Sequence, residues 1–192
     1  MSLFVSMILA SSSALLIPNV ISVDRQYVSE LIAEGNVAYI NEDYGVALDY
    51  YYRAVKADPD DEIAAANYSL VMEKLGFHDA AGWYIFEFLR THPKSPTAWN
   101  IRAIIAESER DWGKCQRFAE EALKVNPNLA AAQYNRACYL AMQGRRPEAI
   151  IALRIAFYQD IGLANLAFYD EHLAPLANIP AFWELLFSQL NQ

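Results

Sequence analysis

The chain has 192 residues, of which 55% are hydrophobic, and it carries 23 acidic against 15 basic side chains, for a formal net charge of −8. An acidic surface maintains solubility but argues against nucleic-acid binding, because a phosphate backbone is held by clustered Lys and Arg. The only adjacent basic pair is Arg145-Arg146, in a predicted turn. We therefore predict no nucleic-acid partner.

The first 23 residues contain no charged side chain. They resemble a secretory signal peptide, with Ser12-Ser13-Ala14 as a small-residue cleavage site, but they lack the Lys or Arg that usually opens one. Pro18 and the serines make the segment a poor membrane span. We predict that residues 1–24 are a signal peptide or anchor and that the protein is exported (periplasmic or secreted) or membrane-anchored. The alternatives are that the segment packs on the rest of the chain, and that the protein is cytoplasmic.

From residue 25 onward the sequence repeats with a fixed period. Ala47, Ala81, Cys115 and Ala149 are each 34 residues apart, and so are Pro59, Pro93 and Pro127. A period near 34 is typical of arrays of helix pairs that stack only on their neighbours. Turn residues and prolines between the apolar stretches predict helices over 26–41, 44–57, 62–75, 78–91, 96–109, 112–125, 130–143 and 147–159.

A second small-residue series indicates how the two helices of each unit meet. Gly35, Ser69, Ala103 and Ala137 keep the same step in the first helix of each pair. Two facing rows of small side chains allow two helix backbones to approach closely. The sequence thus predicts an all-α protein in which each unit is an antiparallel helix pair.

These marks resemble the tetratricopeptide repeat (TPR). In the first unit the run from Glu34-Gly35-Asn36 through Ala47 and Tyr51 to Asp58-Pro59 follows the repeat nearly position for position. The resemblance covers about residues 28–161. Within a repeat domain of residues 25–161 it predicts four units, which are 28–61, 62–95, 96–129 and 130–161. The sequence departs mildly from the repeat at Phe88, Cys115 and Ile161. It implies a right-handed α-solenoid that serves as a protein-interaction scaffold.

Residues 162–192 are predicted to cap the array. The last unit of a solenoid has no successor, so its apolar face needs a cover. The segment from Tyr169 to Leu176, followed by Ile179-Pro180-Ala181-Phe182, resembles the tail that closes many bacterial repeat proteins of this family. We expect Pro180 to lie in the first turn of a final helix, where its missing N–H has no cost.

No motif for catalysis or metal binding is found. His78, His92 and His172 fall in different units, and neither cysteine has the spacing of a zinc or redox site. Cys115 and Cys138 are interpreted as small buried thiols in preference to a disulfide. We predict that the protein is not an enzyme and needs no metal or cofactor.

The first helices of such an array line its concave side, and their inward positions can be predicted by phase. The stripe is mostly apolar with amides interspersed, as expected for a groove that binds an extended or helical peptide. About a third of these residues could instead be core. The predicted groove residues are Ile32, Asn36, Tyr39, Ile63, Asn67, Leu70, Lys74, Asn100, Ile104, Tyr134 and Met142, with Ile40, Ala66, Ile101, Glu107 and Cys138 beside them.

The resemblance also allows a test for one ligand class. Carboxylate-clamp members of the family bind acidic C-terminal peptides through cations and amides at the positions of Ile32, Asn36, Asn67, Thr97 and Ile101. Both amides are present here and all three cations are missing, so the charge-assisted bonds of a clamp cannot form. We expect an unidentified protein or peptide partner that is not a clamp ligand.

Two hypotheses of function remain. The first is an exported or membrane-associated assembly factor or adaptor that presents the groove. The alternative is a cytosolic TPR holding chaperone for an apolar export substrate, although the long apolar N-terminus counts against it.

Overall fold

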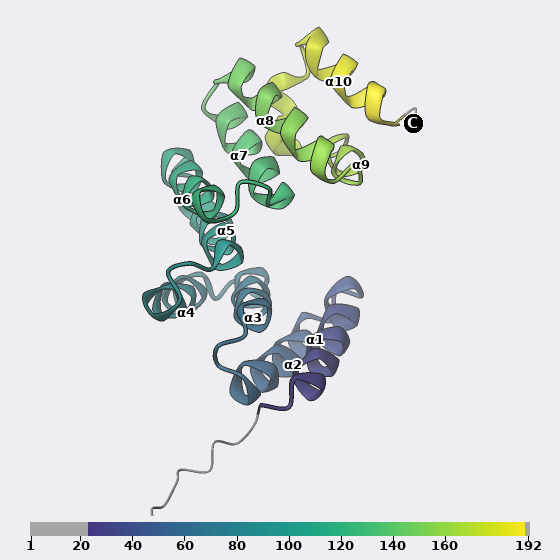
Figure 1. Cartoon of the computed structure of the whole chain (residues 1–192). Coiled ribbons are helices and arrows are strands. Elements are labelled where there is room, and N and C mark those ends of the chain that lie inside the picture. The colour runs from purple at the N-terminus through teal and green to yellow at the C-terminus, as the bar shows by residue number, and fades with distance from the viewer. Residues whose placement is uncertain (1–22, 191–192) are drawn as a thin grey trace, which may run out of the picture.

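The computed structural model describes residues 23–190, and for Ser108, Glu109 and Leu190 it describes the backbone only. The signal-peptide or anchor prediction for residues 1–24 therefore lies almost wholly outside the described residues. Helix pairs stack in chain order along a curved array, with a short capping segment at the C-terminal end (Figure 1). Among residues 23–190, none of the helices is both long and apolar enough to cross a lipid bilayer.

The helices follow the predicted pattern closely. The four pairs are α1 (Arg25–Ile40) and α2 (Tyr44–Ala57), α3 (Glu62–Lys74) and α4 (His78–Thr91), α5 (Pro96–Ile105) and α6 (Trp112–Val125), and α7 (Ala130–Met142) and α8 (Arg146–Gln159). The one difference is that the predicted helix 96–109 is α-helical only to Ile105 and continues as the 3₁₀ helix η1 (Ala106–Glu109). Such tightening is common at helix ends.

The capping segment comprises α9 (Leu163–Ala167), the 3₁₀ helix η2 (Glu171–Leu176) and α10 (Pro180–Leu190). As predicted, α10 begins at Pro180. Large side chains from all three parts pack against α7 and α8 in one core, and among them Leu173, Leu176 and Leu186 are essentially inaccessible to solvent. The segment therefore covers the apolar face of the last unit.

Side-chain caps mark the start of several of the helices. The side chains of Asp61, Ser95 and Asp111 each accept a hydrogen bond from the backbone N–H three residues later, at distances of 2.8, 3.1 and 2.9 Å. Such a bond satisfies one of the N–H groups left unpaired at a helix start. Because each of these capping residues directly precedes its helix, the sequence determines the starts of α3, α5 and α6 locally.

The two small-residue series form the contact between the paired helices. Ala47, Ala81, Cys115 and Ala149 have no solvent exposure, and Gly35, Ser69, Ala103 and Ala137 are also buried. At Gly35 the approach is so close that an added Cβ would lie 2.5 Å from Cε1 of Tyr51. The small residue at this position therefore makes room for Tyr51 of the paired helix in unit 1, and burial of both rows in all four units agrees with the predicted contact.

The turn inside each unit contains one residue with a positive φ, and it recurs every 34 residues. Gly76 and Gly144 have φ values of 82° and 75°, whereas Glu42 and Arg110 occupy the same phase with φ values of 62° and 53°. A residue with a Cβ is strained in this region, and glycine is not.

We therefore expect Glu42→Gly to stabilise the protein by about 1 kcal/mol, since it removes this strain from an exposed turn. Urea unfolding would measure the gain, with Glu42→Ala as the matched control that keeps a Cβ. An equal gain from both variants would show that side-chain loss, not backbone relief, is responsible.

Candidate functional site

The first helices of the units line the inner side of the array. Successive first helices contact one another, α1 with α3, α3 with α5 and α5 with α7, whereas successive second helices barely meet. The first helices are therefore on the short, concave side of the curve and the second helices are on the outer side. All the predicted groove residues lie on these first helices.

A linked pair of amides occupies the inner surface of the first two units. The Tyr51 hydroxyl donates to Asn36 Oδ1 at 2.8 Å, and Asn67 Nδ2 donates to the same oxygen at 3.1 Å. Asn36 is exposed and Asn67 is half-buried. Because both bonds use the carbonyl oxygen of Asn36, its Nδ2 group and Asn67 Oδ1 can serve a ligand as donor and acceptor.

Apolar side chains lie along the same surface. Ile63 is 42% exposed, while Leu70 and Ile104 are half-buried against the core shared by α3, α4 and α5. The remaining predicted groove residues at this surface differ in exposure: Lys74 is exposed, and Ile32, Tyr39 and Met142 are half-buried. Aliphatic side chains thus extend along this surface from unit 1 to unit 3, and the Asn36 and Asn67 amides lie among them in units 1 and 2.

Two of the predicted groove residues, Asn100 and Tyr134, are buried. They are 6% and 3% exposed. Asn100 Oδ1 accepts from Asn135 Nδ2 at 3.0 Å, and the Tyr134 hydroxyl donates to Asp170 Oδ2 at 2.7 Å. Because both side chains are buried and hydrogen-bonded within the chain, we remove them from the set of predicted groove residues.

The capping segment packs across α7 in unit 4. Asp170 accepts from Tyr134 and also from the Cys138 thiol at 3.6 Å. His172 reaches further, to unit 3, where its Nε2 lies 3.7 Å from Glu107 Oε2 and its ring meets Trp112 edge-on. An open cleft of about 490 Å³ remains beside this contact, lined by Glu107, Arg110, Trp112, Met142, Glu171 and His172.

The ionisable groups in this contact shift one another's pKa values. The hydrogen bond with Asp170 raises the pKa of His172 despite partial burial. Burial alone would raise the pKa of Asp170, but hydrogen bonds from His172 and Tyr134 outweigh it and lower the pKa to about 2. Burial also raises the pKa of Glu107, although the Tyr139 hydroxyl donates to it at 2.8 Å. An Asp170 carboxylate therefore faces a protonated His172 below neutral pH.

These shifts predict a pH dependence of folding stability. Because the pKa of folded His172 is raised above 6.5, its stabilising effect is complete below that pH and is lost as pH rises through the folded value. The raised pKa of Glu107 also makes the folded protein less stable as pH rises, but this loss begins at a lower pH, near the usual pKa of a glutamate. We expect the free energy of unfolding, measured with urea, to fall between pH 6 and pH 8, and His172→Gln to reduce that fall. An unchanged pH slope in the variant would contradict this assignment.

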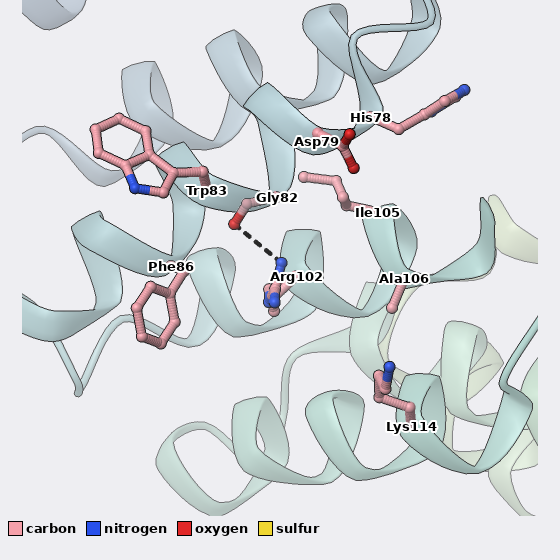
Figure 2. A pocket seen from close by; sticks show the side chains of 9 residues that line it. All are labelled: His78, Asp79, Gly82, Trp83, Phe86, Arg102, Ile105, Ala106 and Lys114. Atoms are coloured by element: carbon pink, nitrogen blue, oxygen red, sulfur yellow. Dashed lines mark hydrogen bonds between the residues drawn. The ribbon is translucent and has the colours of Figure 1, made fainter. Parts of the chain in front are cut away.

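A second hollow, of about 280 Å³, lies between α4 and the helices of unit 3 (Figure 2). Gly82 opens it, because the same phase holds Leu48, Gln116 and Ile150 in the other units. Arg102 crosses the hollow, donates from Nη1 to the Gly82 carbonyl at 2.9 Å, and lies over the Phe118 ring at 5.3 Å.

Two exposed aromatic residues stand at the edge of this hollow and were missed by sequence reasoning. Trp83 and Phe86 are 65% and 49% exposed, and Figure 2 shows both rings on the same side of Arg102. A comparison of the four units at these two repeat positions could have found them. In the other units the position of Trp83 holds Asp49, Arg117 and Ile151, and that of Phe86 holds Tyr52, Glu120 and Arg154.

The described residues offer no obvious chemistry. Both cysteines are buried free thiols, as predicted, and burial raises the pKa of Cys138, which keeps it protonated. Among the residues that the structure describes, no group of three or more His, Cys, Asp or Glu side chains is arranged to hold a metal.

The geometry defines an α-solenoid of stacked antiparallel helix pairs, and comparison with solved structures makes the class more specific. The chain is similar to TTC0263, a thermophilic TPR protein from Thermus thermophilus, with a TM-score of 0.63 and 22% identity over 86% of this chain and 100% of that one. It is also similar to YrrB, a TPR protein with an unusual peptide-binding site (TM-score 0.53, 17% identity, 88% and 87% covered). The first TPR of Spaghetti (RPAP3), bound to the HSP90 peptide SRMEEVD, matches at a TM-score of 0.50 and 19% identity over 68% and 96%.

The fold is that of the right-handed TPR superhelix, as the sequence predicted. No protein-family model matches the sequence, and the search of curated proteins also found no match. At these identities the likeness concerns the fold alone.

Proposed function

We propose that the protein is a non-enzymatic interaction scaffold that binds a peptide segment of a partner in its inner groove. The observation that carries this proposal is the surface from Asn36 to Ile104, where an amide donor and acceptor lie beside partly exposed aliphatic side chains. Amides can pair with a peptide backbone, and aliphatic pockets hold its side chains. The peptide recorded with RPAP3 and the peptide-binding site of YrrB support such a role for this fold.

The partner we propose is not an acidic clamp ligand. Two of the three positions that would need a cation are engaged in the structure: Ile101 is buried, and Thr97 donates to Glu62 at 3.4 Å. The Glu62 carboxylate also accepts from Ser95. The Glu62 carboxylate at this position would repel an acidic peptide.

We further propose that the scaffold works outside the cytoplasm or at a membrane, on the basis of the uncharged first 23 residues. Fractionation of native cells and sequencing of the mature N-terminus test this part. A cytosolic chain with an intact N-terminus would favour the holding-chaperone alternative.

Ile63→Glu is the sharpest test of the groove. Ile63 is exposed, whereas Leu70 and Ile104 pack against the core, so a charge at Ile63 should leave helicity intact. On binding it would place an unpaired charge in a desolvated contact, at a cost of several kcal/mol. We expect the variant to lose the partner that the wild-type protein captures from its native source.

The matched control is Ile151→Glu on α8, because Ile151 is 58% exposed and lies outside the inner surface. It should keep the partner. Moderate salt should also leave the wild-type complex intact, since no clamp charges are present to be screened. Retention of the partner by Ile63→Glu would move the binding site away from the inner groove.

A further inference from the structure

The chain enters the first helix at the edge of the inner groove. Val23, the first described residue, lines a hollow of about 460 Å³ together with Glu62, the first residue of α3. The Glu62 carboxylate also accepts hydrogen bonds from Ser95 and Thr97 at the start of α5. Ile63, which is 42% exposed, is the next residue after Glu62. The residues that precede Val23 are therefore attached beside the first aliphatic position of the groove.

Residues 15–22 have the composition expected of a ligand for this groove. They read Leu-Leu-Ile-Pro-Asn-Val-Ile-Ser, with five aliphatic side chains, one amide and no charged group. Because the clamp positions hold no cation, a ligand without carboxylates loses no charge-assisted bond there. Pro18 has no N–H and favours an extended Ile17, which interrupts a helix and leaves backbone groups of the segment available for pairing.

The segment is long enough to lie across the exposed part of the groove. Eight extended residues span about 26 Å, whereas packed helices are about 8–10 Å apart. Starting beside Ile63, residues 15–22 can therefore cross α3 and reach Ile104 on α5. On this path they pass Asn36 Nδ2 and Asn67 Oδ1, a donor and an acceptor that match the two sides of a peptide bond.

We propose that residues 15–22 occupy the inner groove of their own chain and leave it when a partner peptide binds. This regulation rests on the proposed function, in which the same groove receives the partner. The covalent connection at Val23 makes the contact intramolecular, so an effective concentration on the order of millimolar favours it even where its own contacts are weak. Cleavage after Ala14 would keep residues 15–22 on the chain, so the regulation does not depend on that cleavage.

Binding of a labelled peptide to the full-length chain tests the proposal. The probe is a fluorescein-labelled synthetic peptide with the sequence of residues 15–22, measured by fluorescence anisotropy. Ile17→Glu with Ile21→Glu in the chain gives the segment two charges that would be desolvated in the groove. We expect this double variant to bind the probe on the order of tenfold more tightly than the wild-type chain, because self-occupation reduces the apparent affinity by the fraction of open grooves.

Three controls accompany this comparison. Ile17→Val with Ile21→Val keeps the segment aliphatic, so this chain should bind the probe as weakly as the wild type does. In the double-glutamate background, Ile63→Glu should abolish probe binding, whereas Ile151→Glu on α8 should leave it unchanged. Sedimentation should give the same mass for the wild-type chain and the double-glutamate variant, since segment and groove belong to one chain.

Three results would overturn the proposal. The first is equal affinity of the wild-type chain and the double-glutamate variant for the probe, including no binding to either. The second is probe binding that survives Ile63→Glu. The third is a wild-type oligomer that the double-glutamate variant loses, which would place the segment on a second copy.

Failure of the proposed function gives a different pattern. In that case Ile63→Glu keeps the native partner in the capture experiment, whatever the probe does. If the probe comparison fails while Ile63→Glu loses the native partner, the groove still binds the partner and only its occupation by residues 15–22 is wrong.

Discussion

Removing residues 160–192 will leave a chain that aggregates or loses helicity. The cap inserts Leu173, Leu176, Phe182 and Leu186 into the core of α7 and α8. Burial of one such side chain contributes about 1.5–3 kcal/mol, so the four together amount to on the order of 10 kcal/mol. That is comparable to the whole stability of a typical domain. Sedimentation and circular dichroism of the 1–159 fragment would measure the loss.

Leu173→Ala in the full chain weakens the same contact without removing the cap. The variant removes one buried side chain, so it should lower the free energy of unfolding by about 2–5 kcal/mol without causing aggregation. A soluble, monomeric and fully helical 1–159 fragment would remove the capping role from residues 162–192.

Replacing Ala81 or Ala149 by Leu will force the paired helices of units 2 and 4 apart. Both alanines are completely buried at the contact between the two helices. Added methylene groups in such a packed position cost about 1–3 kcal/mol. The decrease should appear in urea unfolding as a lower midpoint with little change in slope.

Lys74→Leu is the control for the introduced residue, because Lys74 is exposed on the inner surface. It should change the free energy of unfolding very little. Equal destabilisation by Lys74→Leu and Ala81→Leu would mean that the small-residue phase does not mark the helix contact.

The candidate site could be predicted only in part. Phase alone placed Asn36, Ile63 and Asn67 on the inner surface, because a residue's direction on a helix follows from its position in the repeat. The same rule placed Asn100 and Tyr134 there, but neighbouring elements bury both. Accessibility depends on what lies against a residue, and for Tyr134 this is Asp170, which is 36 residues away in the chain.

Trp83 and Phe86 show that the repeat pattern also fails to reveal exposed residues beside a hollow. Both side chains are exposed on α4, and no motif in the sequence marked them as a site. The hollow beside them forms because Gly82 lacks a side chain and Arg102 crosses from α5, 20 residues away. Neither fact follows from the sequence of α4 alone.

The sequence by itself determined the helices, their pairing and the presence of a cap. These features depend on local interactions, namely side-chain caps, small residues at a 34-residue step and prolines after the second helices. Only the tertiary structure decided which of the predicted groove residues are exposed. The path of the cap across unit 4, with Asp170 on Tyr134 and His172 on Glu107, results from contacts between elements that no periodic pattern connects.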